Sequence, residues 1–149
     1  MNIILNYYIF SFPIGSPLDR ETRDHFDLIV NAVDNGISPK TGSVTVSIDI
    51  TDVNDNMPII QTSSPVIMVK EGIPINSKFA KIDASDSDLG ANGKVEFALK
   101  ENQDTFGIDK DSGQLFTKTE IDREVQDKYE LTVVVTDGGS PKSLSTVST

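Results

Sequence analysis

The chain has no cysteine and no tryptophan among its 149 residues. Without cysteine, disulfide bonds and thiolate metal sites are excluded. It also has no Asn-x-Ser/Thr acceptor for N-glycosylation, and no apolar run approaches the roughly 18 residues of a membrane-spanning helix. Basic residues are scarce, since 13 lysines and arginines face 23 aspartates and glutamates, for a net charge of −10. This balance argues against nucleic acid as a partner, because phosphate backbones require a basic surface.

Residues that enzymes use for catalysis are equally scarce. His25 is the only histidine, and no cysteine nucleophile is present. Neither a Gly-x-Ser-x-Gly elbow nor a phosphate-binding loop occurs. Paired carboxylates could support acid–base hydrolysis, but nothing else in the sequence favours it. We therefore expect no enzymatic activity.

What the sequence does contain is an internal repeat. Leu18-Asp19-Arg20-Glu21 matches Ile121-Asp122-Arg123-Glu124 at an offset of 103 residues, and Asp34 matches Asp137 at the same offset. After one deleted residue, a Ser-Pro-Lys tripeptide recurs as well. A repeat of domain size, with carboxylates at equivalent positions, predicts tandem modules.

The repeat sets the expected domain boundaries. Residues 18–58 are the C-terminal part of a first repeat plus an acidic linker, and residues 59–149 are a second repeat that lacks the end of its last strand. Residues 1–17 form an atypical apolar N-terminal segment that matches nothing in the second repeat. The sequence leaves three interpretations of this segment open: a signal-peptide core, a strand pair with altered sequence, or foreign sequence at a truncated end.

Alternating apolar and polar residues predict strands along most of the chain. The pattern covers residues 26–30, 44–50, 95–99 and 129–135, and a further apolar run at 66–69 also predicts a strand. A period of two residues is typical of half-buried strands. No amphipathic helix of useful length is found. Many short strands separated by turns predict an all-β sandwich.

An acidic connector lies between the two repeats and ends in Pro58, which cannot extend a strand ladder. Calcium takes six to eight oxygen ligands, with carboxylates mixed with carbonyls. The connector offers both kinds of oxygen, from the side chains of Asp52, Asn54 and Asp55 and the carbonyls of Val53 and Asn56. This chemistry predicts a calcium site at the boundary.

Each repeat adds further oxygen ligands. They are Asp19 and Glu21 in the first repeat, and Asp86, Asp88, Asn92 and Asp137 in the second. Taken singly, such residues are typical of solvated loops and turns, but their order and domain-sized spacing favour a shared site. Without cations the carboxylates would repel one another, by about 1 kcal/mol for each pair at ~4 Å in water. Calcium is therefore expected to stiffen the junction.

From about residue 18 to residue 149 the chain resembles cadherin extracellular repeats. The matching motifs are Leu-Asp-Arg-Glu, Asp-Val-Asn-Asp-Asn-Met-Pro, Ala-x-Asp-x-Asp-x-Gly-x-Asn-Gly, Phe-Gly-Ile-Asp-x-x-Ser-Gly-x-Leu and Tyr-Glu-Leu-Thr-Val-x-x-Thr-Asp-Gly-Gly-Ser-Pro. The resemblance implies an all-β, Greek-key seven-stranded sandwich for each repeat, with the first repeat truncated. It also implies calcium-dependent cell–cell adhesion, with calcium ions that rigidify the junctions.

The resemblance also implies which residues hold each ion. The outer ion would use Asp19, Glu21 and Asp55. The middle ion would use Glu21, Asp52, the Val53 carbonyl, Asp55 and Asp88. The third ion would use Asn54, Asp86, Asp88 and Asp137 and the carbonyls of Asn56 and Asn92. A family glutamate early in the first repeat has no match here, so the outer two sites are expected to be weakened and the third to be whole.

Other matches imply a longer array. Glu71, Asp122 and Glu124 match one half of a following junction, and Asp34 matches part of a preceding one. Without tryptophan the strand exchange of classical cadherins is not available, so protocadherins or Fat and Dachsous-like proteins are the closer likeness. The implied protein is the extracellular part of a membrane-anchored plasma-membrane protein. Its partners would be other cadherin-like ectodomains, homophilic or heterophilic. A secreted calcium-binding matrix or adhesin module is the alternative.

Overall fold

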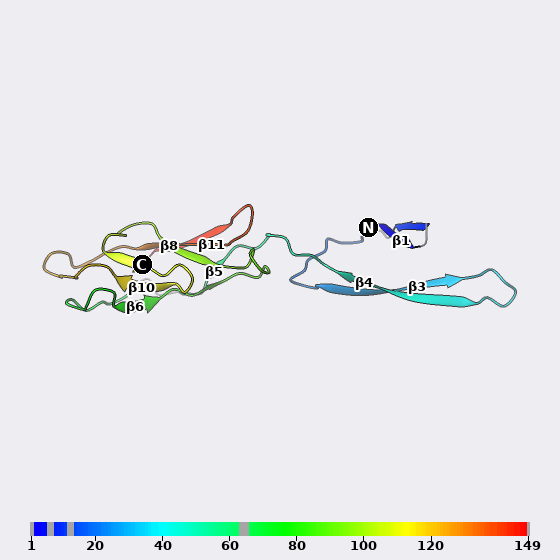
Figure 1. The fold of residues 1–149 in the computed structure, drawn as a ribbon, viewed down its shortest axis with the longest axis horizontal. Coiled ribbons are helices and arrows are strands. Elements are labelled where there is room, and N and C mark those ends of the chain that lie inside the picture. Colours follow the sequence, from blue (N-terminus) through cyan, green and yellow to red (C-terminus); the bar gives the residue numbers. More distant parts are fainter. Residues whose placement is uncertain (1, 6–7, 12–13, 63–65, 149) are drawn as a thin grey trace. The chain divides into compact units, whose positions relative to one another are not determined.

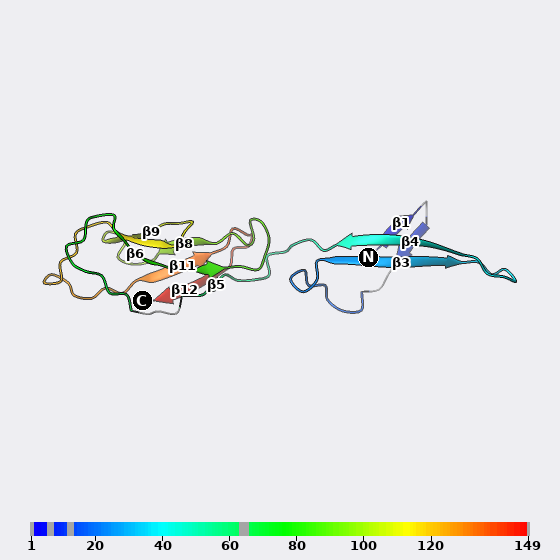
Figure 2. The ribbon, with the colours of Figure 1, turned by 90° about the horizontal axis from the view of Figure 1, so that it is seen from below.

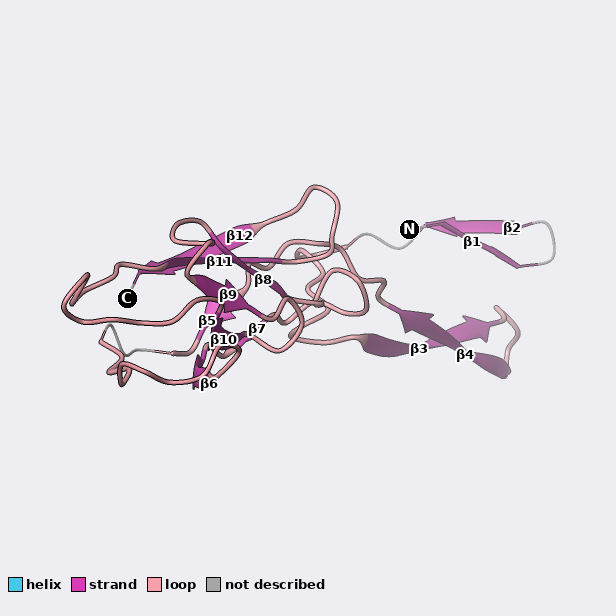
Figure 3. Cartoon of the chain, turned by 60° about the vertical axis from the view of Figure 1, so that its left-hand side comes forward, coloured by secondary structure: helices cyan, strands magenta, loops and turns pink. Residues whose placement is uncertain are grey.

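The computed structural model describes residues 2–5, 8–11, 14–62 and 66–148, and every regular element in them is a β-strand (Figure 3). Contacts divide the chain into two compact units, Met1–Asp52 and Val53–Thr149. The acidic connector is divided with them, because Asp52 belongs to the first unit and the rest of the connector to the second. The described residues contain no helical segment with the length and apolar composition of a membrane span.

The first unit contains two antiparallel hairpins (Figure 1). One pairs β1 (Asn2–Leu5) with β2 (Tyr8–Ser11), within the segment whose origin the sequence left open. The other pairs β3 (His25–Val33) with β4 (Thr41–Asp49), over the two stretches in which apolar and polar residues alternate.

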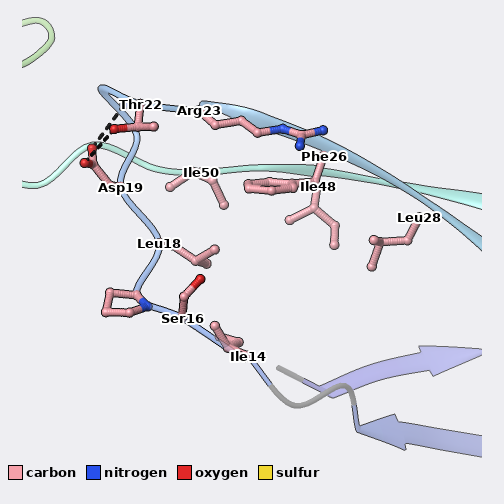
Figure 4. Close-up of a pocket in the computed structure, with 12 residues that line it drawn as sticks. Ile14, Ser16, Leu18, Asp19, Thr22, Arg23, Phe26, Leu28, Ile48 and Ile50 are labelled. Atoms are coloured by element: carbon pink, nitrogen blue, oxygen red, sulfur yellow. Dashed lines mark hydrogen bonds between the residues drawn. The ribbon is translucent and has the colours of Figure 1, made fainter.

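One face of the β3–β4 hairpin is apolar. The two-residue period puts Phe26 and Leu28 of β3 on the same face, and each side chain is half-buried. Together with Ile48 and Ile50 they line an open groove, with Leu18 on its opposite side (Figure 4). The apolar face of the hairpin is therefore only partly covered.

The second unit is built mainly from two three-stranded antiparallel sheets (Figure 2). One sheet has the order β12-β11-β8, formed by β12 (Leu144–Ser148), β11 (Thr132–Thr136) and β8 (Glu96–Leu99). The other has the order β6-β10-β9, formed by β6 (Lys78–Lys81), β10 (Gln114–Thr117) and β9 (Phe106–Ile108). A short additional pair joins β5 (Ile59–Ile60) to β7 (Ala84–Ser85).

The hydrophobic core of the second unit is formed by residues from both of these sheets. Val133 and Val135 of β11 are fully buried, as is Leu115 of β10. Phe106 of β9 packs edge-on against Tyr129, with ring centroids 4.9 Å apart. Apolar side chains of both sheets thus pack into one cluster, and the predicted all-β sandwich class is confirmed.

Two predicted strands differ from the structure. Residues 66–69 do not form a regular strand, although Ile67 packs against the core while Met68 is exposed, so that prediction was wrong. β11 begins at Thr132 instead of residue 129. Around β11 the alternation correctly indicates which side chains point inward. It carries no information on whether a neighbouring backbone completes the ladder of hydrogen bonds.

Candidate metal centre

The connector is hydrogen-bonded to the loop that follows β7. The backbone N–H of Asn56 donates to Asp88 Oδ2 (3.2 Å), and its side-chain amide donates to Asp88 Oδ1 (2.7 Å). The N–H of Asp88 donates in turn to Asp86 Oδ1 (2.9 Å). Within the connector, Asp55 donates its N–H to the Val53 carbonyl at 3.0 Å. Backbone turns of this kind follow from Asp and Asn residues, whose side chains readily bond nearby amides.

Asp137, which directly follows β11, is fully buried. Its carboxylate accepts hydrogen bonds from the N–H of Gly139 (3.0 Å), from the N–H and hydroxyl of Ser143 (3.1 and 2.5 Å) and from the side-chain amide of Asn54 (3.0 Å). Burial opposes ionisation of Asp137, but the hydrogen bonds from Ser143 and Asn54 outweigh it, so the pKa of the carboxyl is lowered. Asp137 is therefore a buried carboxylate held by four donors.

Further bonds bring the remaining loop to the same place. The N–H of Gly138 donates to the carbonyl of Ala91 at 3.1 Å, which sets the loop carrying Asn92 against the Asp137 turn. The Asn54 amide also donates to the Pro141 carbonyl at 2.7 Å. Hydrogen bonds within the second unit thus join the segments that carry all six residues expected for the third ion: Asn54, Asn56, Asp86, Asp88, Asn92 and Asp137.

Two side-chain oxygens of this group are buried without a partner. Asn54 Oδ1 and Asp86 Oδ2 accept no hydrogen bond from the part of the chain that the structure describes. Burying an unpaired polar oxygen costs about 1–3 kcal/mol, and more for a charged group. A cation would supply the missing partner. The donors here are carboxylate, amide and carbonyl oxygens, which suit calcium and not the metals that prefer nitrogen or sulfur. The residues present therefore fit calcium.

Residues 65–149 match the family model of the cadherin domain. The chain belongs to the cadherin family. Calcium binding is a known property of cadherin repeats, so the oxygen-rich group above lies in a family that uses such chemistry. This confirms the resemblance drawn from the motifs.

Individual relatives indicate which branch of the cadherin family the chain is most like. This cadherin chain is 38% identical over 132 residues to Protocadherin Fat 4 of Mus musculus, covering 89% of this chain and 3% of that protein. It is 34% identical over 135 residues to Protocadherin-7 of Homo sapiens, covering 91% of this chain and 13% of the relative. Protein dachsous of Drosophila melanogaster also matches. The expected likeness to protocadherins and Fat or Dachsous-like proteins is confirmed, and the chain spans only a small part of these relatives.

Solved cadherin structures share its fold. The protocadherin gamma-B4 extracellular domain matches with a TM-score of 0.85 at 32% identity, over 99% of this chain and 24% of that one. Mouse cadherin-23 EC22-24 matches with a TM-score of 0.80 at 33% identity, over 89% of this chain and 43% of that one. Both are parts of cadherin ectodomains, and the expected extracellular location is confirmed.

The first unit of this cadherin chain carries three further expected ligands, Asp19, Glu21 and Asp52. Asp19 accepts hydrogen bonds from the N–H and hydroxyl of Thr22 (3.1 and 2.8 Å; Figure 4), and these bonds lower the pKa of its carboxyl. Arg20 forms ion pairs with Glu21 and with Asp52, its Nε lying 2.6 Å from Asp52 Oδ1. Within its own unit, each expected ligand of the first repeat therefore has a hydrogen-bond or ion-pair partner.

Sequence reasoning missed three residues that support these ligands. The Ser143 hydroxyl lies within hydrogen-bond distance of both Asp137 and the Asn56 carbonyl (3.2 Å), and the Pro141 carbonyl accepts a hydrogen bond from the Asn54 amide. Arg20 is the third. The recurring Ser-Pro-Lys tripeptide marked the loop of Pro141 as a repeated feature, but nothing in the sequence indicated its contact with the connector.

A second acidic cluster lies elsewhere in the second unit. Carboxylate oxygens of Glu71, Asp122 and Glu124 lie within 4.8 Å of one another, and all three residues are exposed. Glu71 also accepts the N–H of Arg123 at 3.1 Å. A backbone hydrogen bond lowers the pKa of Glu124, but its bond with Asp122 and the charge of Glu71 outweigh it, so the pKa is raised. These are the residues that the cadherin motifs assign to a further junction.

Proposed function

We propose that this chain is a calcium-dependent adhesion module, in which calcium ions stiffen the junction between consecutive cadherin repeats. The observation that carries the proposal is the pair of buried oxygens without partners, Asn54 Oδ1 and Asp86 Oδ2. They belong to the same hydrogen-bonded group as the fully buried Asp137 carboxylate. Without a bound cation, burying these oxygens without partners would destabilise the folded state.

The chain's own residues would be distributed among the three calcium ions as the cadherin motifs imply. The third ion would be held by Asn54, Asp86, Asp88 and Asp137 and by the carbonyls of Asn56 and Asn92. The outer and middle ions would draw on Asp19, Glu21, Asp52, Asp55 and Asp88 and on the Val53 carbonyl. Bound calcium supplies the positive charge that offsets the repulsion among these carboxylates. The cluster of Glu71, Asp122 and Glu124 would serve a further junction in the same way.

The partners we propose are other cadherin-like ectodomains. The matched protocadherin gamma-B7 EC3-6 structure is a cis-dimer, which shows one way in which such ectodomains associate. We further propose that the parent protein is anchored in the plasma membrane and that its adhesive contacts are homophilic or heterophilic. Beads coated with the full chain are expected to aggregate in calcium and to disperse in EDTA.

Thermal unfolding with and without calcium tests the metal centre. Extracellular modules bind calcium with dissociation constants of about 10⁻⁴ to 10⁻³ M. Calcium at about 5 mM is therefore expected to raise the melting temperature by about 5 °C or more, because a ligand that binds only the folded state stabilises it. Asp86→Ala is expected to abolish most of that gain, since it removes one of the two unpartnered oxygens.

Asp111→Ala is the matched control, because Asp111 is an exposed aspartate of the same unit whose carboxylate pairs with Lys94, at 3.3 Å. It is expected to keep the full calcium response. Equal melting temperatures of the unaltered chain in calcium and in EDTA would refute the proposal. A response that Asp86→Ala leaves intact would refute the assignment of the third ion.

A further inference from the structure

Arg20 occupies an unusual position in the first unit. It lies between two of the acids expected to bind calcium, and its guanidinium forms ion pairs with both Glu21 and Asp52. The side chain of Arg20 is 11% exposed and that of Asp52 is 16% exposed, so their pairing is largely shielded from water. The contact joins the turn before β3 to the last residue of the unit, which is the first residue of the connector.

The counterpart of Arg20 in the second repeat behaves differently. Arg123 stands at the same place in the repeated Asp-Arg-Glu motif, but its side chain forms no ion pair with any residue that the structure describes. Only its backbone N–H contacts an acid, Glu71. The carboxylates around it crowd together, and the pKa of Glu124 is raised. In the first repeat the arginine of this motif thus pairs with the neighbouring acids. In the second repeat the equivalent arginine side chain forms no ion pair with the described acids around it.

The chemistry of a guanidinium explains what Arg20 does in the first repeat. Arginine is always charged and presents several donors in a planar fork, so one side chain can serve two carboxylates. Without the arginine that they share, the two carboxylates would repel each other, and the shielded Asp52 would be left without this counter-ion. A dication that takes oxygens from Glu21 and Asp52 must therefore displace the guanidinium or share the oxygens with a nearby positive charge.

We propose that Arg20 is an internal counter-ion of the calcium site: it neutralises Glu21 and Asp52 when calcium is absent and competes with calcium for their oxygens. The inference rests on the proposed function, because it requires that these two acids bind calcium. Arg20 is a positioning residue that sets the calcium concentration at which the first unit responds. It also keeps the turn before β3 and the start of the connector together at low calcium.

Nuclear magnetic resonance of the full chain tests this role directly. Calcium is titrated while the Arg20 Nε signal and the amide signals of Glu21 and Asp52 are followed, in the unaltered chain and in Arg20→Gln, Arg20→Lys and Lys40→Gln. The Arg20 Nε signal is expected to shift as calcium binds. In Arg20→Gln the half-saturating calcium concentration at Glu21 and Asp52 is expected to fall about fivefold, as for loss of one competing ion pair.

The two further variants separate charge from geometry. Arg20→Lys keeps the competing charge and is expected to bind calcium within about twofold of the unaltered chain. Lys40→Gln removes one positive charge from the same unit, beyond the far end of the β3–β4 hairpin, and is expected to change nothing. In EDTA, Arg20→Gln is also expected to show faster amide exchange around Glu21 and Asp52 than the unaltered chain does.

Each result decides between the two proposals. If the unaltered chain shows no calcium-dependent shifts, the proposed function fails. If it responds but Arg20→Gln binds calcium equally or more weakly, the proposed function stands and the counter-ion role is refuted, since Arg20 would then not compete with calcium for the oxygens of Glu21 and Asp52. An Arg20 Nε signal that does not move with calcium, measured in the unaltered chain, refutes the role even if Arg20→Gln fails to fold.

Discussion

The two repeats place equivalent strands in different surroundings. Leu28 and Val30 of β3 correspond to Leu131 and Val133 of the second repeat at the offset of 103 residues. Leu131 and Val133 are 5% and 0% exposed, whereas Leu28 and Val30 are only half-buried. Positions with identical residues in both repeats thus differ in burial, although both pairs face the apolar side of their unit.

The opposing layer of strands accounts for this difference. In the second unit, Leu115 and Phe106 come from the other sheet and join Leu131 and Val133 in one buried cluster. In the first unit the equivalent face lines the open groove shown in Figure 4. Alternation decides which way a side chain points, but burial requires a second layer to pack against it. The local pattern therefore predicts strands equally well in both repeats, but it does not predict that only the second repeat has a closed core.

The largest expected effect comes from truncating the matched leucines. Leu131→Ala is expected to destabilise the second unit by about 2–5 kcal/mol, because it leaves a cavity in a closed core. Leu28→Ala is expected to destabilise the first unit by about 1 kcal/mol or less, because its side chain is already partly in water. Urea unfolding followed by circular dichroism, with amide exchange to assign each loss to its unit, measures both.

Val134→Ala is the control for strand propensity, since Val134 lies on the outward side of β11 between two buried neighbours. Val134→Ala is expected to destabilise the second unit by much less than Leu131→Ala does. If Leu28→Ala proved as costly as Leu131→Ala, the contrast between the two repeats would be wrong.

The next effect concerns the matched glycines of the two Asp turns. Gly139 corresponds to Gly36. A Cβ on Gly139 would lie 2.6 Å from Asn54 Oδ1, whereas one on Gly36 would lie 3.1 Å from Asp34 Oδ1. Gly139→Ala is therefore expected to push Asn54 away from Asp137, to cost about 1–2 kcal/mol through lost hydrogen bonds, and to remove most of the calcium-induced rise in melting temperature.

Gly36→Ala is expected to change stability by no more than about 0.5 kcal/mol and to leave the calcium response intact. Thermal unfolding in calcium and in EDTA measures both variants. A Gly139→Ala protein with a full calcium response would show that Asn54 is not a ligand.

Much of the fold could be predicted because it follows from local chemistry. The alternation around Val133 predicts a strand, and the Asp-Gly-Gly sequence after it predicts the turn that holds Asp137. The oxygen-rich loops were predicted in the same way, since Asp86, Asp88 and Asn54 are residue types that offer oxygen ligands. Their assignment to a third ion follows from the cadherin motifs and stays a prediction. Each of these features can be recognised within a short window of sequence.

The rest depends on contacts between distant residues. Ser143 supports Asp137 only because the loop folds back, and the Pro141 carbonyl meets Asn54 across 87 residues of sequence. The sequence does not indicate that Arg20 pairs with Asp52, which the structure places beside it. The irregular backbone at residues 66–69 likewise depends on whether a neighbouring strand pairs with it. None of these contacts can be predicted from a short window of sequence.

The smallest expected effect is a difference in pH dependence between the two repeats. His25 corresponds to Lys128 at the same offset, and Asp27 corresponds to Glu130. His25 Nδ1 lies 2.6 Å from Asp49 Oδ1, and its Nε2 lies 3.2 Å from Asp27 Oδ1. Only the imidazolium can donate from both nitrogens, and the bonds to Asp49 and then Asp27 raise the pKa of His25 above its ordinary value.

A raised pKa in the folded state fixes the sign of the effect. The stabilisation by His25 is fully present below the unfolded-state pKa of about 6.5 and is lost as pH rises through the higher folded-state pKa. The matching pair in the second repeat, Lys128 and Glu130 at 3.5 Å, contains no histidine, the residue type whose ordinary pKa lies in this pH range. Amide exchange at the His25 end of β3–β4 is therefore expected to accelerate, once corrected for intrinsic rates, as the pH rises above 6.5, while that of β11 does not. His25→Gln removes the difference, and a ring-proton titration that placed the His25 pKa at or below 6.5 would contradict it.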